Sequence, residues 1–134
     1  MQQPHRHHLR VRYGETDQMG RVHHANHLLY FEEARTGMMR DLGMSYARLE
    51  ERGVGLPVRK VDVRYRRAAR YEEQLVVETT IARLGPASVT FSYRILCAED
   101  GDLVATGSTE LACIDLADGS LAKLPADVAA AFGA

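Results

Sequence analysis

The chain has 134 residues, a length typical of one domain, so we expect a single domain over residues 1–134. Hydrophobic residues make up 46% of it and charged residues 26%, ordinary globular values that exclude disordered and fibrous proteins. With 17 basic and 18 acidic residues the net charge is −1, which argues against nucleic acid or an anionic membrane as a partner.

The N-terminal segment, residues 1–12, is polar and histidine-rich, so it predicts neither a signal peptide nor a membrane anchor, and its histidines are expected to face solvent. No later run approaches the ~18 apolar residues of a membrane-spanning helix. Cys97 and Cys113 lie in strand-like runs, where a reduced thiol is expected to pack as a small core residue. These features together predict a cytoplasmic protein.

The first third of the chain predicts a strand, a loop and a long helix. Residues 9–13 alternate apolar and basic side chains, as a half-buried strand does, and residues 14–20 are polar and turn-rich. From about residue 25 to residue 42, apolar side chains recur at steps of three and four, which indicates a helix. Asn26 is expected to cap its start and Gly43 to follow its end. The apolar stripe consists of Leu28, Phe31, Ala34, Met38 and Leu42.

Beyond a short second helix predicted at 45–52, the apolar period changes from helical to twofold. Turn signals at 85–86 and 99–101 separate the resulting strands, which implies antiparallel hairpins. A short helix is expected near 126–132. The predicted strands span 58–65, 75–81, 89–97 and 103–114. The fold class is therefore α+β, an antiparallel sheet of about five strands against one long helix. Because one helix covers only one face of such a sheet, we expect a second copy to cover the other.

The densest chemical signal is the loop-to-helix junction at residues 13–30. A carboxylate on the loop before a helix lies near unpaired backbone N–H groups, which favour negative charge. Such a carboxylate is half of an acyl-transfer site. One acyl-transfer reaction, thioester hydrolysis, needs a nucleophile or base at the carbonyl carbon and donors for the oxyanion that forms. Asp17 and the amides around His24 and Ala25 are the candidates, and Gly20 would allow a ligand to approach the loop backbone closely.

The same junction carries the string Asp-x-x-Gly-x-Val, here Asp17, Gly20 and Val22, followed by His24 and the helical Tyr30-Phe-Glu-Glu-Ala-Arg-Thr36. This pattern resembles the 4-hydroxybenzoyl-CoA thioesterase-like family of hot-dog proteins, and the resemblance extends over about residues 8–131. Later segments that resemble the family's middle strands and C-terminal segment lie at 65–71, 75–79, 88–91 and 124–127. The resemblance implies a hot-dog fold, in which the sheet wraps around the long helix.

The resemblance also implies an acyl-CoA thioesterase that needs no cofactor or metal. Asp17 would be the catalytic nucleophile or base, the His24 amide would polarise the thioester carbonyl, and the His24 side chain would assist. The site would lie at an interface of a homo-oligomer, a dimer or a tetramer. The substrate-binding residues would be Gly20, Val22, Ala25 and Tyr30, together with Arg59, Lys60, Arg66 and Arg67, which would hold the CoA phosphates. Two departures from the family pattern are Ala68 for a proline and His27 for an aromatic residue.

Other interpretations of these residues stay open. Asp17 before Gly20 alone is typical of an Asx turn, and only the whole string through Thr36 favours catalysis. His23, His24 and His27, with Glu32 and Glu33, also fit a metal site, although no His-Glu-x-x-His string is present. A hot-dog hydratase is a second enzymatic alternative, but the Asn-Pro-hydrophobic-His string that such enzymes carry after the aspartate is missing. A non-catalytic acyl-CoA-binding or metal-binding oligomer is the third.

Overall fold

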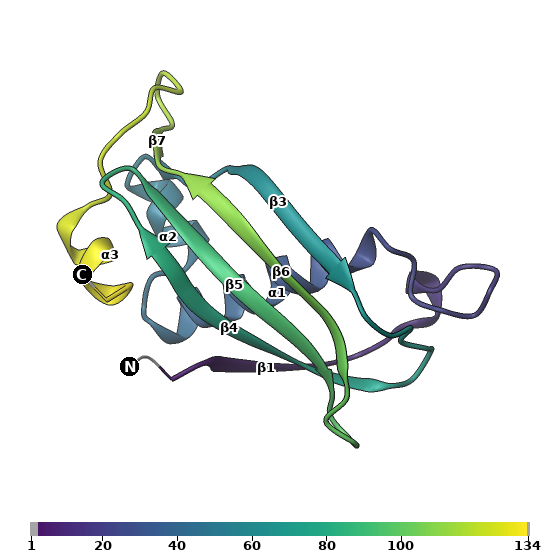
Figure 1. Ribbon diagram of the computed structural model, residues 1–134. Coiled ribbons are helices and arrows are strands. Elements are labelled where there is room, and N and C mark those ends of the chain that lie inside the picture. The colour runs from purple at the N-terminus through teal and green to yellow at the C-terminus, as the bar shows by residue number, and fades with distance from the viewer. Residues whose placement is uncertain (1–2, 134) are drawn as a thin grey trace.

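Long runs of alternating apolar and polar residues form the sheet against which one helix packs (Figure 1). The computed structural model describes residues 3–133, so residues 1, 2 and 134 of the expected domain lie outside the described part. The five strands are antiparallel, in the order β1-β4-β5-β6-β3. Their bounds are β1 His5–Arg10, β3 Val58–Tyr65, β4 Gln74–Leu84, β5 Ser88–Cys97 and β6 Leu103–Ala112. The predicted α+β class and antiparallel sheet are confirmed.

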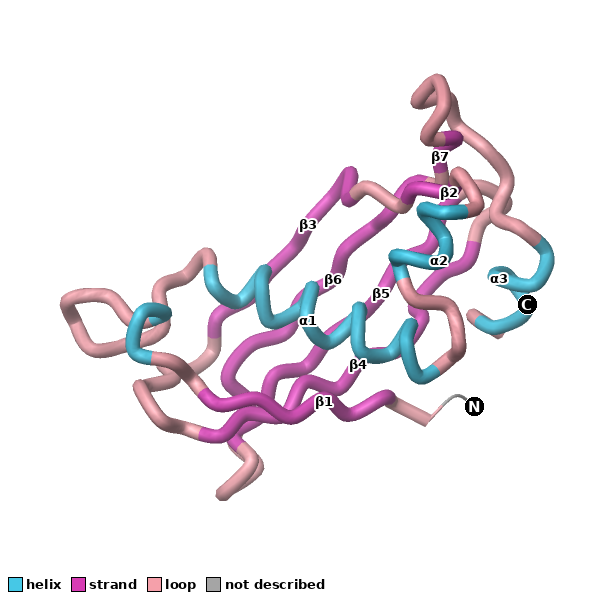
Figure 2. Tube along the Cα trace, turned by 180° about the vertical axis from the view of Figure 1, so that it is seen from behind, coloured by secondary structure: helices cyan, strands magenta, loops and turns pink. Residues whose placement is uncertain are grey.

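The long helix α1 (Asn26–Asp41) lies across one face of the sheet, as Figure 2 shows from behind. Phe31 is fully buried and stacks on Tyr93 of β5, with ring centroids 4.3 Å apart. The helix ends as predicted, because Gly43 adopts a φ of +82° that favours glycine. The expected cap at Asn26 is wrong: Ala25 is the N-cap residue, and Asn26 is the first residue of the helix.

The short elements gather at the end of the sheet away from the start of α1 (Figure 1). They are α2 (Tyr46–Glu51), the paired strands β2 (Val54–Gly55) and β7 (Ile114–Asp115), and α3 (Ala126–Ala131). Ser45 caps α2 by accepting a hydrogen bond from the Arg48 amide, which confirms the predicted second helix. Cys97 and Cys113 are buried free thiols, also as predicted. No helix in residues 3–133 has the length and apolarity needed to cross a membrane.

The N-terminal strand differs from the prediction. β1 begins at His5, not at residue 9, and pairs with β4 along its whole length. His8 is exposed as expected, but His5 and His7 are partly buried and paired: His5 Nε2 lies 2.7 Å from a carboxylate oxygen of Asp41, and His7 Nε2 lies 2.6 Å from one of Glu33. His5 and His7 lie at the alternating positions of β1 that face α1, and Leu9 is the first apolar residue on that face, so the beginning of the strand has no apolar pattern to predict it.

The outer face of the sheet is polar, which removes the reason given above for covering it. Residues that alternate with the core positions of β3, β5 and β6 point away from α1. They include Asp62, Arg64, Ser92, Arg94, Thr106 and Ser108, which line one shallow hollow on that face. A polar sheet face is stable in water, so this face does not by itself call for a second copy.

The buried hydroxyl of Thr79 allows a prediction about the free energy of unfolding. Thr79 on β4 is fully buried, and its Oγ1 is without a hydrogen-bond partner in residues 3–133. Thr79→Val keeps the side-chain shape and removes the unpaired hydroxyl, so we expect it to raise the free energy of unfolding by about 1 kcal/mol. Urea denaturation measures the change.

Thr109→Val is the matched control for this prediction. Thr109 is buried too, but its Oγ1 lies 2.5 Å from Tyr93 Oη and 3.4 Å from the guanidinium Nη1 of the buried Arg35. Because its loss removes a hydrogen-bond partner of Tyr93 Oη and one of the two acceptors of Arg35 Nη1, Thr109→Val should lower the free energy of unfolding. Equal effects of the two variants would contradict the assignment of the Thr79 hydroxyl as unpaired.

Candidate active site

Glu15 fixes the loop that precedes α1. One oxygen of its carboxylate accepts hydrogen bonds from the Arg12 amide and from Tyr30 Oη, each 2.8 Å long. Its backbone carbonyl accepts from the His23 amide at 2.9 Å and from Asn26 Nδ2 at 3.0 Å. One residue therefore joins the beginning of the loop to its end and to the first turns of α1. This arrangement sets the position of Asp17, two residues further on.

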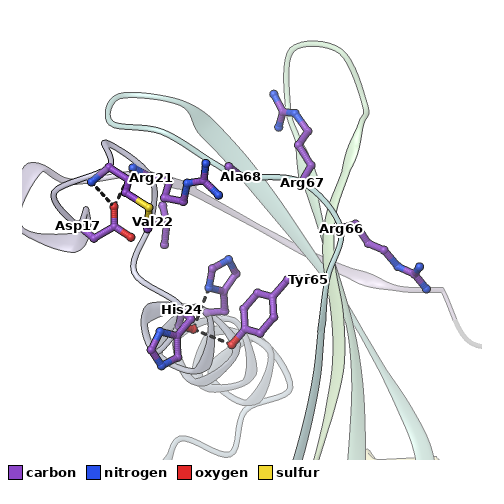
Figure 3. Close-up of a pocket in the computed structure, with 10 residues that line it drawn as sticks. Asp17, Arg21, Val22, His24, Tyr65, Arg66, Arg67 and Ala68 are labelled. Carbon is purple, nitrogen blue, oxygen red and sulfur yellow. Dashed lines mark hydrogen bonds between the residues drawn. The ribbon is translucent and has the colours of Figure 1, made fainter.

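Asp17 occupies a tight turn within that loop. Its Oδ1 accepts hydrogen bonds from the Met19 amide at 2.9 Å and from the Arg21 amide at 3.3 Å (Figure 3). The Asx turn weighed above is therefore present. The second oxygen, Oδ2, accepts no hydrogen bond from residues 3–133, so the carboxylate is held in place through one oxygen and keeps the other for a ligand. The side chain is half-buried and lines a cavity of about 380 Å³.

The amide of His24 lies at the turn that leads into α1. It has no acceptor in the described part of the chain, which leaves it available as a donor. The Ala25 amide, the other predicted donor, is directed to His23 Nδ1 at 3.3 Å. The structure thus keeps one of the two predicted backbone donors free.

The carbonyl of His24 is held from two sides. It accepts a hydrogen bond from His27 Nδ1 at 3.0 Å and one from Tyr65 Oη at 2.9 Å (Figure 3). His27 belongs to α1 and Tyr65 to the end of β3, and their rings meet edge to face at 4.8 Å. The sheet and the helix together therefore orient the turn that carries the free His24 amide.

The cavity gathers some of the predicted residues and not others. Its lining consists of Asp17, Met19, Arg21, Val22, His24, His27, Tyr65, Arg66, Arg67 and Ala68. Of the predicted site residues, Asp17, Val22, His24, Arg66 and Arg67 are therefore present. Gly20, Ala25, Tyr30, Arg59 and Lys60 are absent from the lining.

Two of the absent residues have structural roles. Tyr30 is 3% exposed, and its hydroxyl donates to Glu15. Burial, together with the bond to Glu15, raises the pKa of Tyr30, so the hydroxyl remains a donor at neutral pH. Gly20 adopts a φ of +78°, which explains a glycine there without any approach of a ligand to its backbone.

The predicted phosphate cations divide into paired and unpaired side chains. Arg59 Nε lies 2.6 Å from Glu110 Oε2, and Arg67 lies 3.2 Å from a Glu73 oxygen with Asp100 and Asp102 beyond. Lys60 has no ion-pair partner in the described residues, but five residues of strand, about 17 Å, separate it from Tyr65 at the cavity. Arg66 lines the cavity without an ion-pair partner in residues 3–133, and its side chain extends away from Asp17 (Figure 3).

Sequence reasoning missed three residues of the site. Arg21 is exposed, lines the cavity and has no carboxylate partner in residues 3–133. Its place between Gly20 and Val22 of the predicted loop was a usable signal. Tyr65 and Glu15 act through contacts with His24 and Tyr30, respectively, which are distant in sequence, so no local pattern identified them.

The three histidines of the junction do not gather as metal ligands. Within residues 3–133 there is no group of three or more His, Cys, Asp or Glu side chains placed to hold a metal ion. His27 Nδ1 is directed to a backbone carbonyl instead. Among residues 3–133, the groups that remain available to a ligand are the second carboxylate oxygen of Asp17 and the backbone amide of His24. Arg21 and Arg66, which have no carboxylate partner in those residues, line the same cavity. An anchored carboxylate and a backbone donor on one cavity are suited to acyl transfer.

Comparison with known proteins points to the same chemistry. Residues 11–132 match the family model of the thioesterase-like superfamily. YneP of Bacillus subtilis is 36% identical over 107 residues, 80% of this chain and 77% of that protein. The acyl-CoA thioester hydrolase YbgC of Escherichia coli O6:H1 is 33% identical and covers 92% of both chains. The solved DHNA-CoA thioesterase of Staphylococcus aureus is 35% identical, with a TM-score of 0.87 over 90% of this chain and 80% of that one. These similarities confirm the hot-dog fold.

Proposed function

Because the chain belongs to the thioesterase-like superfamily and is a thioester hydrolase, we propose that Asp17 catalyses hydrolysis of an acyl-CoA or aroyl-CoA thioester in the cavity at the start of α1. The relatives named above for acyl-CoA and DHNA-CoA support this substrate class. One observation carries the proposal: Asp17 and His24 line the same cavity. Within residues 3–133, one carboxylate oxygen of Asp17 accepts no hydrogen bond and the backbone amide of His24 has no acceptor.

The reaction follows from these two groups. Asp17 either attacks the thioester carbonyl carbon or takes a proton from a water molecule that attacks it. In both routes the carbonyl oxygen gains the negative charge, and the His24 N–H donates a hydrogen bond to it. The carbon–sulfur bond then breaks, and CoA leaves as a thiolate that takes up a proton. In the first route, water subsequently cleaves the acyl-Asp17 anhydride. The products are the free acid and CoA.

A thiol-release assay across short, long and aromatic acyl-CoAs tests the proposed function. We expect at least one acyl-CoA to give free acid and free thiol in equal amounts. Crotonyl-CoA is included because a hydratase would remove its double bond without releasing thiol. Loss of the double bond with the thioester intact, or no turnover of any acyl-CoA, would show that the function is different.

The unpaired cations support a binding site for the CoA phosphates. Arg21 and Arg66 line the cavity, and neither has a carboxylate partner in residues 3–133. Arg59 and Arg67, by contrast, are engaged by carboxylates of the chain itself. We therefore assign phosphate binding to Arg66, because Arg59 and Arg67 are paired and the Arg21 amide lies 3.3 Å from Asp17 Oδ1, at the thioester end. The direction of Arg66, away from Asp17, agrees with this role because the phosphates lie at the opposite end of CoA from the thioester (Figure 3).

Replacing Arg66 with glutamine should raise KM for acyl-CoA about tenfold and leave kcat nearly unchanged. Steady-state kinetics gives both constants. The same acyl group on pantetheine, which lacks the nucleotide phosphates, is the substrate control, and its KM should not respond. Arg48→Gln, at an exposed position of α2, is the matched protein control. An equal rise in KM for both substrates would refute phosphate binding.

Edge strand β3 supports a homodimer. In the described part of the chain, β3 is the last strand at one edge of the sheet, so one side of its backbone has no partner strand there. Three of its apolar and aromatic side chains, Val58, Val61 and Tyr65, are each 42–50% exposed. Such an edge is a template for strand pairing. Pairing two copies through β3 would bring the second copy beside the Tyr65 to Ala68 wall of the cavity, in line with a site at an interface.

Val61→Lys tests this association, because a charge in the middle of β3 opposes pairing of the two edges. Sedimentation analysis should give twice the mass of the chain for the wild type and the monomer mass for the variant. Lys replacement of Leu121, which is exposed and pairs with Ile114 of β7 and not with β3, should leave the dimer intact. A wild-type monomer, or a Val61→Lys dimer as stable as the wild type, would refute the β3 interface.

The two cysteines bear on the cellular compartment in which the enzyme acts. Both are buried free thiols, Cys97 on β5 and Cys113 between β6 and β7. Burial raises the pKa of the Cys113 thiol, which keeps it protonated and unreactive. Unpaired thiols persist in reducing compartments, and we propose the cytoplasm as the place where the enzyme meets acyl-CoA.

A further inference from the structure

Arg21 places a cation at the thioester end of the cavity. Its backbone amide lies 3.3 Å from Asp17 Oδ1, and its side chain is exposed and lines the cavity. Figure 3 shows Arg21 on the same side of the cavity as Asp17, whereas the Arg66 side chain extends away on the other side. Under the proposed function, Arg21 therefore lies near the acyl group and not near the nucleotide phosphates at the far end of CoA.

A second arginine lies opposite Arg21. Arg21 and Arg70 form an isolated antiparallel bridge, next to which the Val22 amide donates to the Ala69 carbonyl at 2.8 Å. Residues opposite each other in such a bridge present their side chains on the same face, with Cα atoms about 4.5 to 5.5 Å apart. Nη1 of Arg70 lies 3.5 Å from the carbonyl oxygen of Gly20, the residue before Arg21. The bridge thus brings two positive side chains together.

The chain itself does not neutralise these two charges. Within residues 3–133, no carboxylate lies within ion-pair distance of either guanidinium. Asp17 accepts from the Arg21 amide and not from its side chain, and Glu73 binds the Arg67 side chain and only the backbone amide of Arg70. Like charges directly opposite each other are destabilising, so an anion bound between them would stabilise both.

The chemistry of the guanidinium group indicates which anion fits. Its planar fork of N–H donors matches the two oxygens of a carboxylate, which it binds through two parallel hydrogen bonds. Both arginines are exposed, so a ligand can reach them without displacing a side-chain partner. Since Arg21 lies at the thioester end, the carboxylate that it can reach is one carried by the acyl group.

We propose that Arg21, with Arg70 beside it, binds a carboxylate on the acyl part of the substrate. This inference rests on the proposed thioesterase function and adds a substrate class, the CoA thioesters of dicarboxylic acids. Arg21 is then a specificity-determining residue, because its charge-assisted hydrogen bonds form only with a substrate that carries the second carboxylate. A neutral acyl chain leaves both arginines hydrated and gains no such bonds.

Substrate pairs with equal numbers of acyl carbons test the proposal. Malonyl-, succinyl-, glutaryl- and adipyl-CoA are compared with propionyl-, butyryl-, valeryl- and hexanoyl-CoA, respectively, after subtraction of thiol release without enzyme. For the wild type, kcat/KM should favour at least one dicarboxylic member over its neutral partner by about tenfold. Both members of a pair carry the same CoA, so the ratio cancels the effect of phosphate binding. High salt should reduce the ratio, because it screens exposed charges.

Two variants connect that preference to Arg21. Arg21→Gln removes the charge and keeps the backbone amide that donates to Asp17, so the ratio should fall to nearly one through a loss on the dicarboxylic substrate. Arg21→Lys keeps the charge without the planar fork and should give an intermediate ratio. Arg64→Gln is the matched control, because it removes an exposed arginine from the outer face of the sheet, and its ratio should equal that of the wild type. Circular dichroism checks that each variant folds.

The outcomes separate this inference from the proposed function. Equal kcat/KM for the two members of every pair would overturn the role of Arg21 and leave a thioesterase. A preference that survives in Arg21→Gln would overturn it too. So would an equal loss for both members of a pair in that variant, because Arg21 would then act on the CoA or the thioester that they share. Failure to hydrolyse any thioester, aliphatic or aromatic, would instead overturn the proposed function itself.

Discussion

Asp17→Asn should lower kcat for acyl-CoA hydrolysis by at least ~10²-fold, the effect expected for a positioned nucleophile or base. The amide oxygen of asparagine can still accept the hydrogen bonds that the Met19 and Arg21 amides donate to Asp17 Oδ1. The turn should therefore persist while the charge and the attacking oxygen are lost. Thiol release under saturating substrate measures the change.

Asp118→Asn is the matched control for Asp17. Asp118 Oδ1 accepts from the amide two residues ahead, Ser120, at 2.9 Å, the same distance and spacing as between Asp17 and Met19. It lies in the turn after β7, at the opposite end of the molecule. Its replacement should leave kcat within twofold of the wild type. If Asp17→Asn behaved like this control, Asp17 would be a structural turn residue only.

Gly107→Ala should destabilise the fold by roughly 2 to 3 kcal/mol, because an added methyl group has no space. Gly107 lies on β6 and pairs with Tyr93, directly beneath Phe31 of α1. A Cβ there would lie 2.5 Å from a ring carbon of Phe31 and 2.6 Å from the backbone oxygen of Asp62. The strand oxygen cannot move aside as a flexible side chain would. Chemical denaturation monitored by far-UV circular dichroism gives the loss.

Gly14→Ala separates a steric effect from the general effect of replacing glycine. Nothing lies within 4 Å of a Cβ built at Gly14, which is exposed. The free energy of unfolding of this variant should lie within about 0.5 kcal/mol of that of the wild type, as is usual for surface substitutions. A Gly107→Ala variant as stable as Gly14→Ala would mean that Phe31 does not occupy the space above β6.

The elements with strong periodicity were predictable from the sequence. The stripe from Leu28 to Leu42 predicted α1 to within one residue at each end, because burial of its middle residues imposes helical spacing, although Leu28 and Leu42 themselves are exposed. β1 was placed too late because His5 and His7 make its inward face polar, and their partners Asp41 and Glu33 are distant in sequence. The polar outer face of the sheet was also not predicted. Its polar residues alternate along separate strands, and the sequence does not show that the strands bring them together on one surface.

The site was predictable as far as it is local. Asp17 and His24 belong to one short string, and the structure brings them to one cavity. Arg66 was among the predicted residues, but which of the predicted cations are free could not be predicted, because it depends on carboxylates elsewhere in the chain: Glu110 engages Arg59 and Glu73 engages Arg67. Tyr65 was missed for the same reason, since its contact with His24 joins residues 41 positions apart.

A complex with a ketone analogue of the substrate, in which a methylene group replaces the thioester sulfur, tests the central claim most directly. The account predicts the ketone oxygen at about 3 Å from the His24 amide nitrogen, with the Asp17 carboxylate, or a water bound to it, facing the carbonyl carbon. An analogue whose carbonyl binds beyond hydrogen-bonding distance of His24, with Asp17 directed away from it, would contradict the account.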